Sequence, residues 1–153
     1  MEATLKSIEP TIKRDYSDNI SKGERLFEAG KIEEAIQCFE GILVKNLRNA
    51  EALNNLGVIS YAIGDFESAE KFLLKTLSIN PNHIRALINI ADVYRQSGRF
   101  NDAARHLTTA IELESKNPEI WECLSNFYKD IGDHEQAQTA RNNSTMLKQG
   151  STQ

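Results

Sequence analysis

The side chains best able to carry catalytic or metal-binding chemistry in this 153-residue chain are two cysteines and three histidines. They are Cys38, Cys123, His83, His106 and His134. The cysteines lie far apart, which is typical of neither a metal motif nor a disulfide framework, and no cation stands beside either thiol to activate it. The histidines share no predicted helix face, and the chain lacks the phosphate-binding glycine loop and the nucleophile elbow of known enzyme classes. We therefore predict a protein that is not an enzyme, with no catalytic residue, no metal ligand and no cofactor.

Two asparagines offer a different chemistry, because an amide can both donate to and accept from a peptide bond. Asn55 and Asn89 are separated by the same interval that separates Gly64 from Gly98. If both face one surface, they could hold the backbone of an extended polypeptide with little regard to its sequence. The alternative is that they are solvated helix residues without a ligand. The choice depends on the elements that position them.

A fixed period of about 34 residues runs through the chain and predicts those elements. Glycines recur at Gly30, Gly64, Gly98 and Gly132, and alanines recur at Ala35, Ala69, Ala103 and Ala137. Composition alone cannot generate two series with the same period. We expect four units, with an N-terminal tail or short capping segment before them and a mobile tail after them. The units are residues 16–49, 50–83, 84–117 and 118–151, and the two end segments are residues 1–15 and 152–153.

Each unit is predicted to form two helices, as the second unit illustrates. Leu53, Leu56 and Ile59 have the spacing of one helix face. Gly64 then interrupts the pattern, since glycine readily adopts the left-handed conformation that ends a helix. A second helix follows and ends before Pro81, which cannot continue it. The alanine series is expected where the two helices of a unit cross closely, with Gly23, Gly57 and Ala91 as the small residues on the first helix.

Three segments of this unit resemble the consensus of the tetratricopeptide repeat family. They are residues 50–57 (AEALNNLG), 64–69 (GDFESA) and 77–82 (LSINPN), and Trp121 stands where that family often has tryptophan. The resemblance covers residues 16–151. It implies an all-α fold, namely a right-handed superhelical solenoid of antiparallel helix-turn-helix hairpins with seven to eight helices. It also implies a concave groove whose wall is formed mostly by the first helix of each hairpin.

On that wall the resemblance places the candidate partner-binding residues. They are Asn54, Asn55, Val58, Tyr61, Arg85, Ile88, Asn89, Asp92, Arg95 and Asn126. A similar asparagine ladder occurs in the helical repeats of the family's glycosyltransferases, which favours an extended peptide as the ligand. Some relatives instead grip a terminal carboxylate, but this chain matches their residues only at Asn55 and Arg85 and fails at Ile20, Glu24 and Asn89. Acidic residues outnumber basic ones on the wall, so a neutral or basic partner is expected.

Composition excludes other classes of ligand and location. The net charge is −4 and the longest basic cluster is Lys13-Arg14, which argues against nucleic acid as a partner. The longest apolar runs, such as residues 42–44, are far too short for membrane insertion. Residues 1–15 lack the continuous apolar stretch of a secretory signal, so a cytoplasmic location is expected.

We therefore predict a non-catalytic protein-protein interaction module or scaffold that binds a peptide or a partner domain in the groove. Two alternatives stay open: the accessory repeat region of a larger enzyme of the glycosyltransferase or methyltransferase type, and a self-assembling scaffold. Self-association is possible, but a monomer is favoured, because polar residues replace most of the apolar face of the last helix. These residues are Arg141, Asn142, Asn143 and Ser144, as expected of a capping unit.

Overall fold

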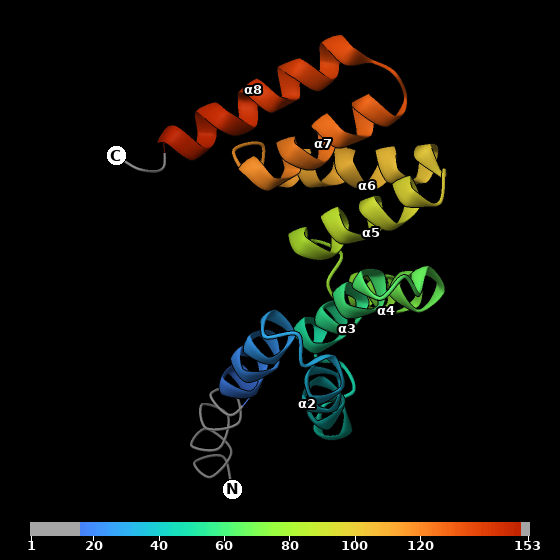
Figure 1. Cartoon of the computed structure of the whole chain (residues 1–153), viewed down its shortest axis with the longest axis vertical. Helices are drawn as coiled ribbons and strands as arrows, with labels where there is room; N and C mark the ends of the chain where they lie inside the picture. The colour runs from blue at the N-terminus through green and yellow to red at the C-terminus, as the bar shows by residue number, and fades with distance from the viewer. Residues whose placement is uncertain (1–15, 151–153) are drawn as a thin grey trace, which may run out of the picture.

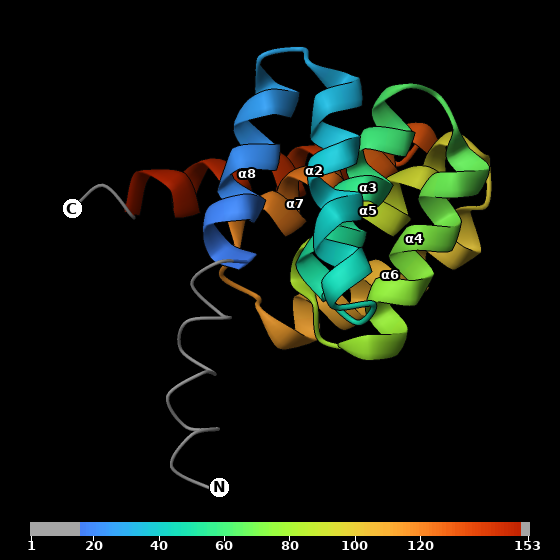
Figure 2. The ribbon, with the colours of Figure 1, turned by 90° about the horizontal axis from the view of Figure 1, so that it is seen from below.

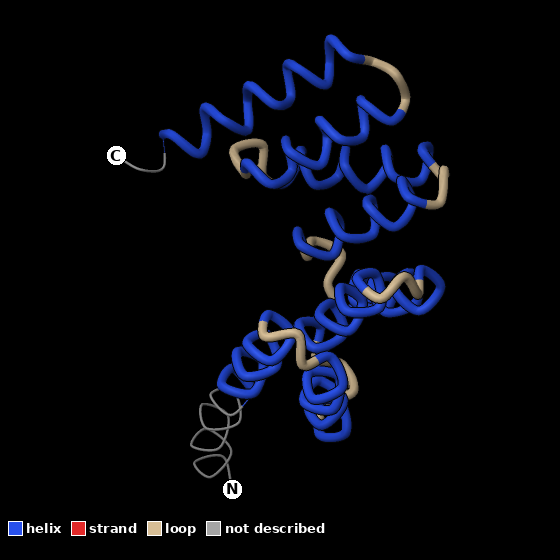
Figure 3. Tube along the Cα trace, in the orientation of Figure 1, coloured by secondary structure: helices blue, strands red, loops and turns tan. Residues whose placement is uncertain are grey.

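The computed structural model describes residues 16–150, and every regular element in this range is an α-helix (Figures 1 and 3). A first helix occupies residues 16–28. It is followed by α2 (Ile32–Lys45), α3 (Ala50–Ala62), α4 (Phe66–Ile79), α5 (Ile84–Gln96), α6 (Phe100–Leu113), α7 (Pro118–Asp130) and α8 (His134–Gly150). The predicted all-α fold is confirmed, while the expected segments at residues 1–15 and 152–153 lie outside the described residues. No helix within residues 16–150 is long and apolar enough to cross a bilayer.

The helices form antiparallel hairpins that stack one after another along the molecule (Figure 1). From α2 to α8, each helix packs on the next one in the chain. In addition, α3 contacts α5 and α5 contacts α7, so the first helices of successive hairpins lie side by side. Figure 2 shows that α8 runs in a different direction from α2, because the hairpins turn progressively about the axis of the array. This is the predicted solenoid of helical hairpins.

Side-chain caps and left-handed glycines set the ends of the helices. Asn49, His83 and Asn117 precede α3, α5 and α7, and each side chain accepts a hydrogen bond from a backbone N–H of the first turn. Gly64 follows α3 with a φ of 82°. This backbone conformation is energetically unfavourable for a residue that carries a side chain. The equivalent glycines repeat it with φ values of 75°, 71° and 82° at Gly30, Gly98 and Gly132.

The alanine series lies at the crossing of the two helices of each hairpin. The exposed fraction is 0% for Ala35, Ala69 and Ala103 and 4% for Ala137. On the facing helix of the second hairpin, a Cβ atom added to Gly57 would lie 2.7 Å from Leu73 Cγ and 3.5 Å from the carbonyl oxygen of Ala69. The two backbones therefore approach closely enough that only small residues fit between them.

A polar network on α4, α5 and the start of α6 fixes one surface of the array. The Tyr94 hydroxyl donates to Glu70 Oε1 at 3.0 Å, and Arg99 Nη1 donates to the same oxygen at 2.9 Å. The Arg99 guanidinium also lies 4.2 Å from the centre of the Tyr94 ring. Burial and the hydrogen bond to Glu70 raise the pKa of Tyr94 to about 12, so its hydroxyl stays a donor at neutral pH.

The last hairpin departs from the apolar pattern of the other three. One repeat position is occupied by buried Phe39, Leu73 and Leu107 in the first three units. In α8 the equivalent residue is Arg141, which is exposed. Ser144, one turn later, is buried and its hydroxyl donates to the carbonyl oxygen of Pro118 at 2.9 Å. These polar residues do not interrupt α8, which is helical over 17 residues.

Candidate functional site

Six of the ten predicted wall residues line one cavity of about 260 Å³ between α3, α5 and α7. We call this cavity the amide pocket, and its lining residues are Asn54, Asn55, Val58, Arg85, Ile88, Asn89 and Glu119. The residues come from the first helices of three successive hairpins, which lie side by side. Residues that are far apart in the sequence thus meet because each hairpin presents the same face of its first helix to this cavity. The pocket combines amides and charged groups with the aliphatic surfaces of Val58 and Ile88.

The asparagines of the amide pocket have different roles. Asn89 Nδ2 donates to Asn54 Oδ1 at 3.1 Å, and Asn54 is only 1% exposed. Asn55 Nδ2 donates to the carbonyl oxygen of Glu51 in its own helix at 3.0 Å. Each of Asn55 and Asn89 keeps an amide oxygen and a second N–H for a ligand, since a primary amide carries two donors and one acceptor oxygen. Asn54 was predicted as a contact residue, but its burial makes it the support that orients Asn89.

Acidic groups surround the amide pocket and balance its one cation. Arg85 Nη1 lies 3.7 Å from Glu24 Oε1, which belongs to the 16–28 helix. His83 Nδ1 accepts from the backbone N–H of Ala86 at 3.2 Å, so its Nε2 donates to Glu51 Oε1 at 3.1 Å. This hydrogen bond from His83 lowers the pKa of Glu51, which therefore stays ionised at neutral pH. The surroundings favour a ligand segment that is neutral or basic.

The other four predicted wall residues do not line the amide pocket. Arg95 Nη2 lies 3.2 Å from Asp92 Oδ1, and the same guanidinium pairs with Asp130 of α7. The Tyr61 ring packs against Phe66 with their centroids 5.6 Å apart. These three predicted residues are engaged within the protein itself. The fourth, Asn126, lines a separate cavity between α7 and α8.

His83 is the residue of this region that the sequence interpretation missed. The sequence predicts only that it shares no helix face with the other histidines, whereas it caps α5 and holds Glu51 at the pocket edge. A signal was available, because Asn49 and Asn117 stand one repeat period before and after it and both are typical capping residues. A polar side chain at this repeat position predicts a cap.

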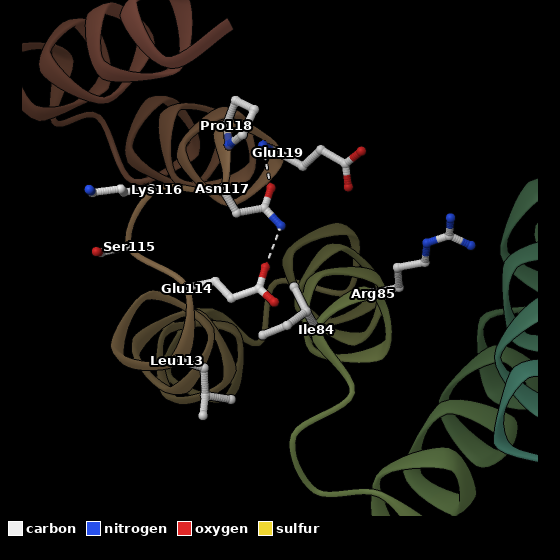
Figure 4. A pocket seen from close by; sticks show the side chains of 9 residues that line it. All are labelled: Ile84, Arg85, Leu113, Glu114, Ser115, Lys116, Asn117, Pro118 and Glu119. Atoms are coloured by element: carbon white, nitrogen blue, oxygen red, sulfur yellow. Dashed lines mark hydrogen bonds between the residues drawn. The ribbon is translucent and has the colours of Figure 1, made fainter. Parts of the chain in front are cut away.

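A larger cavity of about 840 Å³ adjoins the amide pocket beside the start of α5 and the turn between α6 and α7 (Figure 4). Arg85 and Glu119 line both cavities. Asn117 Nδ2 donates to Glu114 Oε2 at 2.9 Å, and Asn117 Oδ1 accepts from the backbone N–H of Glu119 at 3.0 Å. Figure 4 shows Arg85 extending away from this hydrogen-bonded pair. The hollow surface next to the amide pocket is therefore wider than the predicted residues alone indicate.

The two thiols differ in burial and in their hydrogen-bond partners. Cys123 is 4% exposed, and its Sγ donates to Asp92 Oδ1 at 3.3 Å. Burial, with the carboxylate of Asp92 beside it, raises the pKa of the Cys123 thiol. Cys38 is half-buried and donates to the carbonyl oxygen of Asn19 at 3.2 Å. Within residues 16–150, no group of three or more histidine, cysteine or acidic side chains could hold a metal ion.

We expect the two thiols to react at very different rates with a reagent such as 5,5′-dithiobis(2-nitrobenzoic acid). In the folded protein Cys38 should react first, because Cys123 is buried and its thiol is held in the protonated form. In denaturant both should react at once. The absorbance of the released thiolate measures this, with Cys38→Ser and Cys123→Ser variants to assign the two phases. Rapid modification of Cys123 in the folded protein would contradict the structure.

Comparison with protein families gives two matches, both to models described as tetratricopeptide repeat. One model matches residues 48–114 and the other matches residues 106–139. Together they cover residues 48–139, which is more than half of the chain. The matched range contains α3 to α7 and every residue of the amide pocket.

Several curated proteins are similar over part of their length. The chain is 33% identical to the general transcriptional corepressor trfA of Dictyostelium discoideum over 56% of the chain and 6% of that protein. It is 26% identical to DnaJ homolog subfamily C member 3 of Gallus gallus over 81% and 28% of the two lengths. It is 27% identical to the peroxisomal targeting signal receptor of Yarrowia lipolytica, over 81% of this chain and 21% of that protein. The chain thus spans less than a third of each of these relatives.

Solved structures of MamA share the fold. One matches with a TM-score of 0.72 and 16% identity, covering 99% of this chain and 86% of that one. A MamA structure from Desulfovibrio magneticus RS-1 gives a TM-score of 0.70 and 19% identity, over 86% and 74% of the two chains. At these identities the likeness concerns the arrangement of the helices alone.

Proposed function

The chain belongs to the tetratricopeptide repeat family, and from this premise we propose that it binds an extended segment of another protein in the amide pocket. The fold supports a general role as a protein-interaction scaffold, since long concave surfaces are what helical repeat arrays present to partners. Among the relatives, one is named as a receptor for a targeting signal and another as a corepressor. For this chain we propose a non-catalytic role.

The observation that carries the proposal is the placement of Asn55 and Asn89 in one cavity, each with an amide oxygen and a second N–H left for a ligand. A peptide backbone alternates donors and acceptors, and an amide side chain can match both. Val58 and Ile88 add aliphatic surface between the amides for side chains of the ligand. The acidic surroundings, including Glu51 and Glu119, make a neutral or basic segment the proposed partner.

The proposal can be tested by affinity capture from a lysate of the source cells. The unmodified protein is compared with a variant whose amide pocket is filled by a larger side chain. Asn55→Arg places a long charged side chain in the amide pocket and leaves the bond between Asn89 and Asn54 intact. We expect quantitative mass spectrometry to show partners that the unmodified protein captures and the Asn55→Arg variant loses. Isothermal calorimetry with a peptide from such a partner should then show direct binding.

The matched control is Glu67→Ala with Lys71→Ala, two exposed residues of α4 that do not line the amide pocket. It should capture the same partners as the unmodified protein. If the Asn55→Arg variant is folded and also captures the same partners, the amide pocket is not the contact surface and the proposal fails.

A further inference from the structure

A second cavity, of about 250 Å³, lies between the two helices of the last hairpin. We call it the cationic pocket. Its lining includes Glu122, Asn126 and Lys129 from α7 and Arg141, Ser144 and Lys148 from α8. Among these residues only Asn126 is one of the ten predicted partner-binding residues, and the groove interpretation does not account for the residues of α8.

The composition of the cationic pocket departs from the repeat. Arg141 stands at the position where Phe39, Leu73 and Leu107 are buried in the other hairpins. A polar face is enough to cap a repeat array, so capping accounts for the loss of the apolar residue. It does not account for three cations around one cavity in a chain whose net charge is −4.

The charges of the cationic pocket are only partly balanced. Lys148 Nζ pairs with Glu122 Oε2 at 2.7 Å. Within residues 16–150, neither Lys129 nor Arg141 has an ion pair. Three cations against one carboxylate leave two positive charges in excess. The Asn126 amide adds a neutral donor beside them, while the Ser144 hydroxyl donates to Pro118 and can only accept.

We propose that the cationic pocket binds a phosphate group. A phosphate near neutral pH carries a charge close to −2, which matches the two excess positive charges of the pocket. Its oxygens accept several hydrogen bonds. The Arg141 guanidinium can bind two of these oxygens at once, and Lys129 contributes a mobile point charge. Displacement of the Lys148 ammonium from Glu122 would add a third cation. This site is separate from the amide pocket, and its test does not depend on the proposed peptide ligand.

The test is a titration of the isotopically labelled full chain with sodium phosphate at constant ionic strength, followed by two-dimensional NMR. We expect saturable shifts of backbone amides in α7 and α8. Lys129→Gln with Arg141→Gln should weaken binding by about ten-fold or more, because both removed cations would form charge-assisted hydrogen bonds with the phosphate. Glu122→Gln should strengthen it, because one repelling carboxylate is removed.

The matched control is Lys71→Gln with Lys75→Gln, which removes the same charge from the exposed face of α4 and should leave phosphate affinity unchanged. A short peptide with one phosphoserine, and the same peptide with serine, distinguish the sources. Tighter binding of the phosphopeptide than of inorganic phosphate assigns the pocket to a phosphorylated partner, and equal binding assigns it to free phosphate. The proposal is overturned if the shifts do not saturate, or if the folded double variant and the control bind phosphate equally well.

Discussion

Replacing Ala69 with leucine is expected to lower the free energy of unfolding by about 1–3 kcal/mol, the usual cost of overpacking a filled core. Ala69 is fully buried, and its carbonyl oxygen lies 3.5 Å from the point where a Cβ on Gly57 would stand. The added carbons have no space between α3 and α4, so the helices must separate or the side chain must leave its preferred rotamer. Urea denaturation followed by circular dichroism measures the change.

A control on the same helix separates overpacking from a general effect of added apolar surface. Glu67 is exposed and precedes Ala69 by half a turn of α4, so Glu67→Leu should change the free energy of unfolding by no more than about 0.5 kcal/mol. Equal stability of the Ala69→Leu variant and the unmodified protein would show that the alanines do not set the distance between the helices.

Replacing both Asn55 and Asn89 with alanine is expected to weaken binding of a peptide partner by roughly five-fold to more than a hundred-fold. Each lost hydrogen bond to the ligand contributes about 0.5–1.5 kcal/mol net, and the two effects should add if the sites act independently. Calorimetry with a partner found by affinity capture measures the dissociation constant. Unchanged affinity in the folded double variant would exclude the amides as backbone contacts.

The hydrogen bonds of the two asparagines decide which single variant is the better test. Asn89→Ala leaves the buried Asn54 Oδ1 without its donor, which should cost on the order of 1–3 kcal/mol of stability. The Asn55→Ala single variant avoids this loss, because the Asn55 amide donates to the Glu51 carbonyl oxygen of its own helix. The matched control is again Glu67→Ala with Lys71→Ala, since both residues are exposed on α4 and neither lines the amide pocket.

The hairpin fold could be predicted from the sequence because two kinds of small residue repeat with one period. Gly64 and its equivalents end the first helices, and Ala69 and its equivalents allow the second helices to pack closely. Both effects are local to one hairpin, so the constant period was enough to infer the antiparallel pairs. Helices at the expected places then bring Asn55 and Asn89 into one cavity.

The finer assignment of wall residues could not be predicted in the same way. Counting positions along a helix places Asn54 and Asn55 on one face, but only the packing of α5 against α3 shows that Asn54 is covered. In the same way, Arg95 meets Asp130 because α5 and α7 lie side by side. Such contacts depend on the rotation of one hairpin relative to the next, which single-helix patterns do not encode.

The stacking of each helix on its neighbours also bears on how the chain folds. Among α2 to α8, no backbone contact joins helices more than two apart in the chain, and the connecting turns are short. Little chain entropy is therefore lost in closing loops before native contacts form, which favours rapid folding. Since each interface involves only adjacent hairpins, a nucleus can arise in any of them and spread to either side.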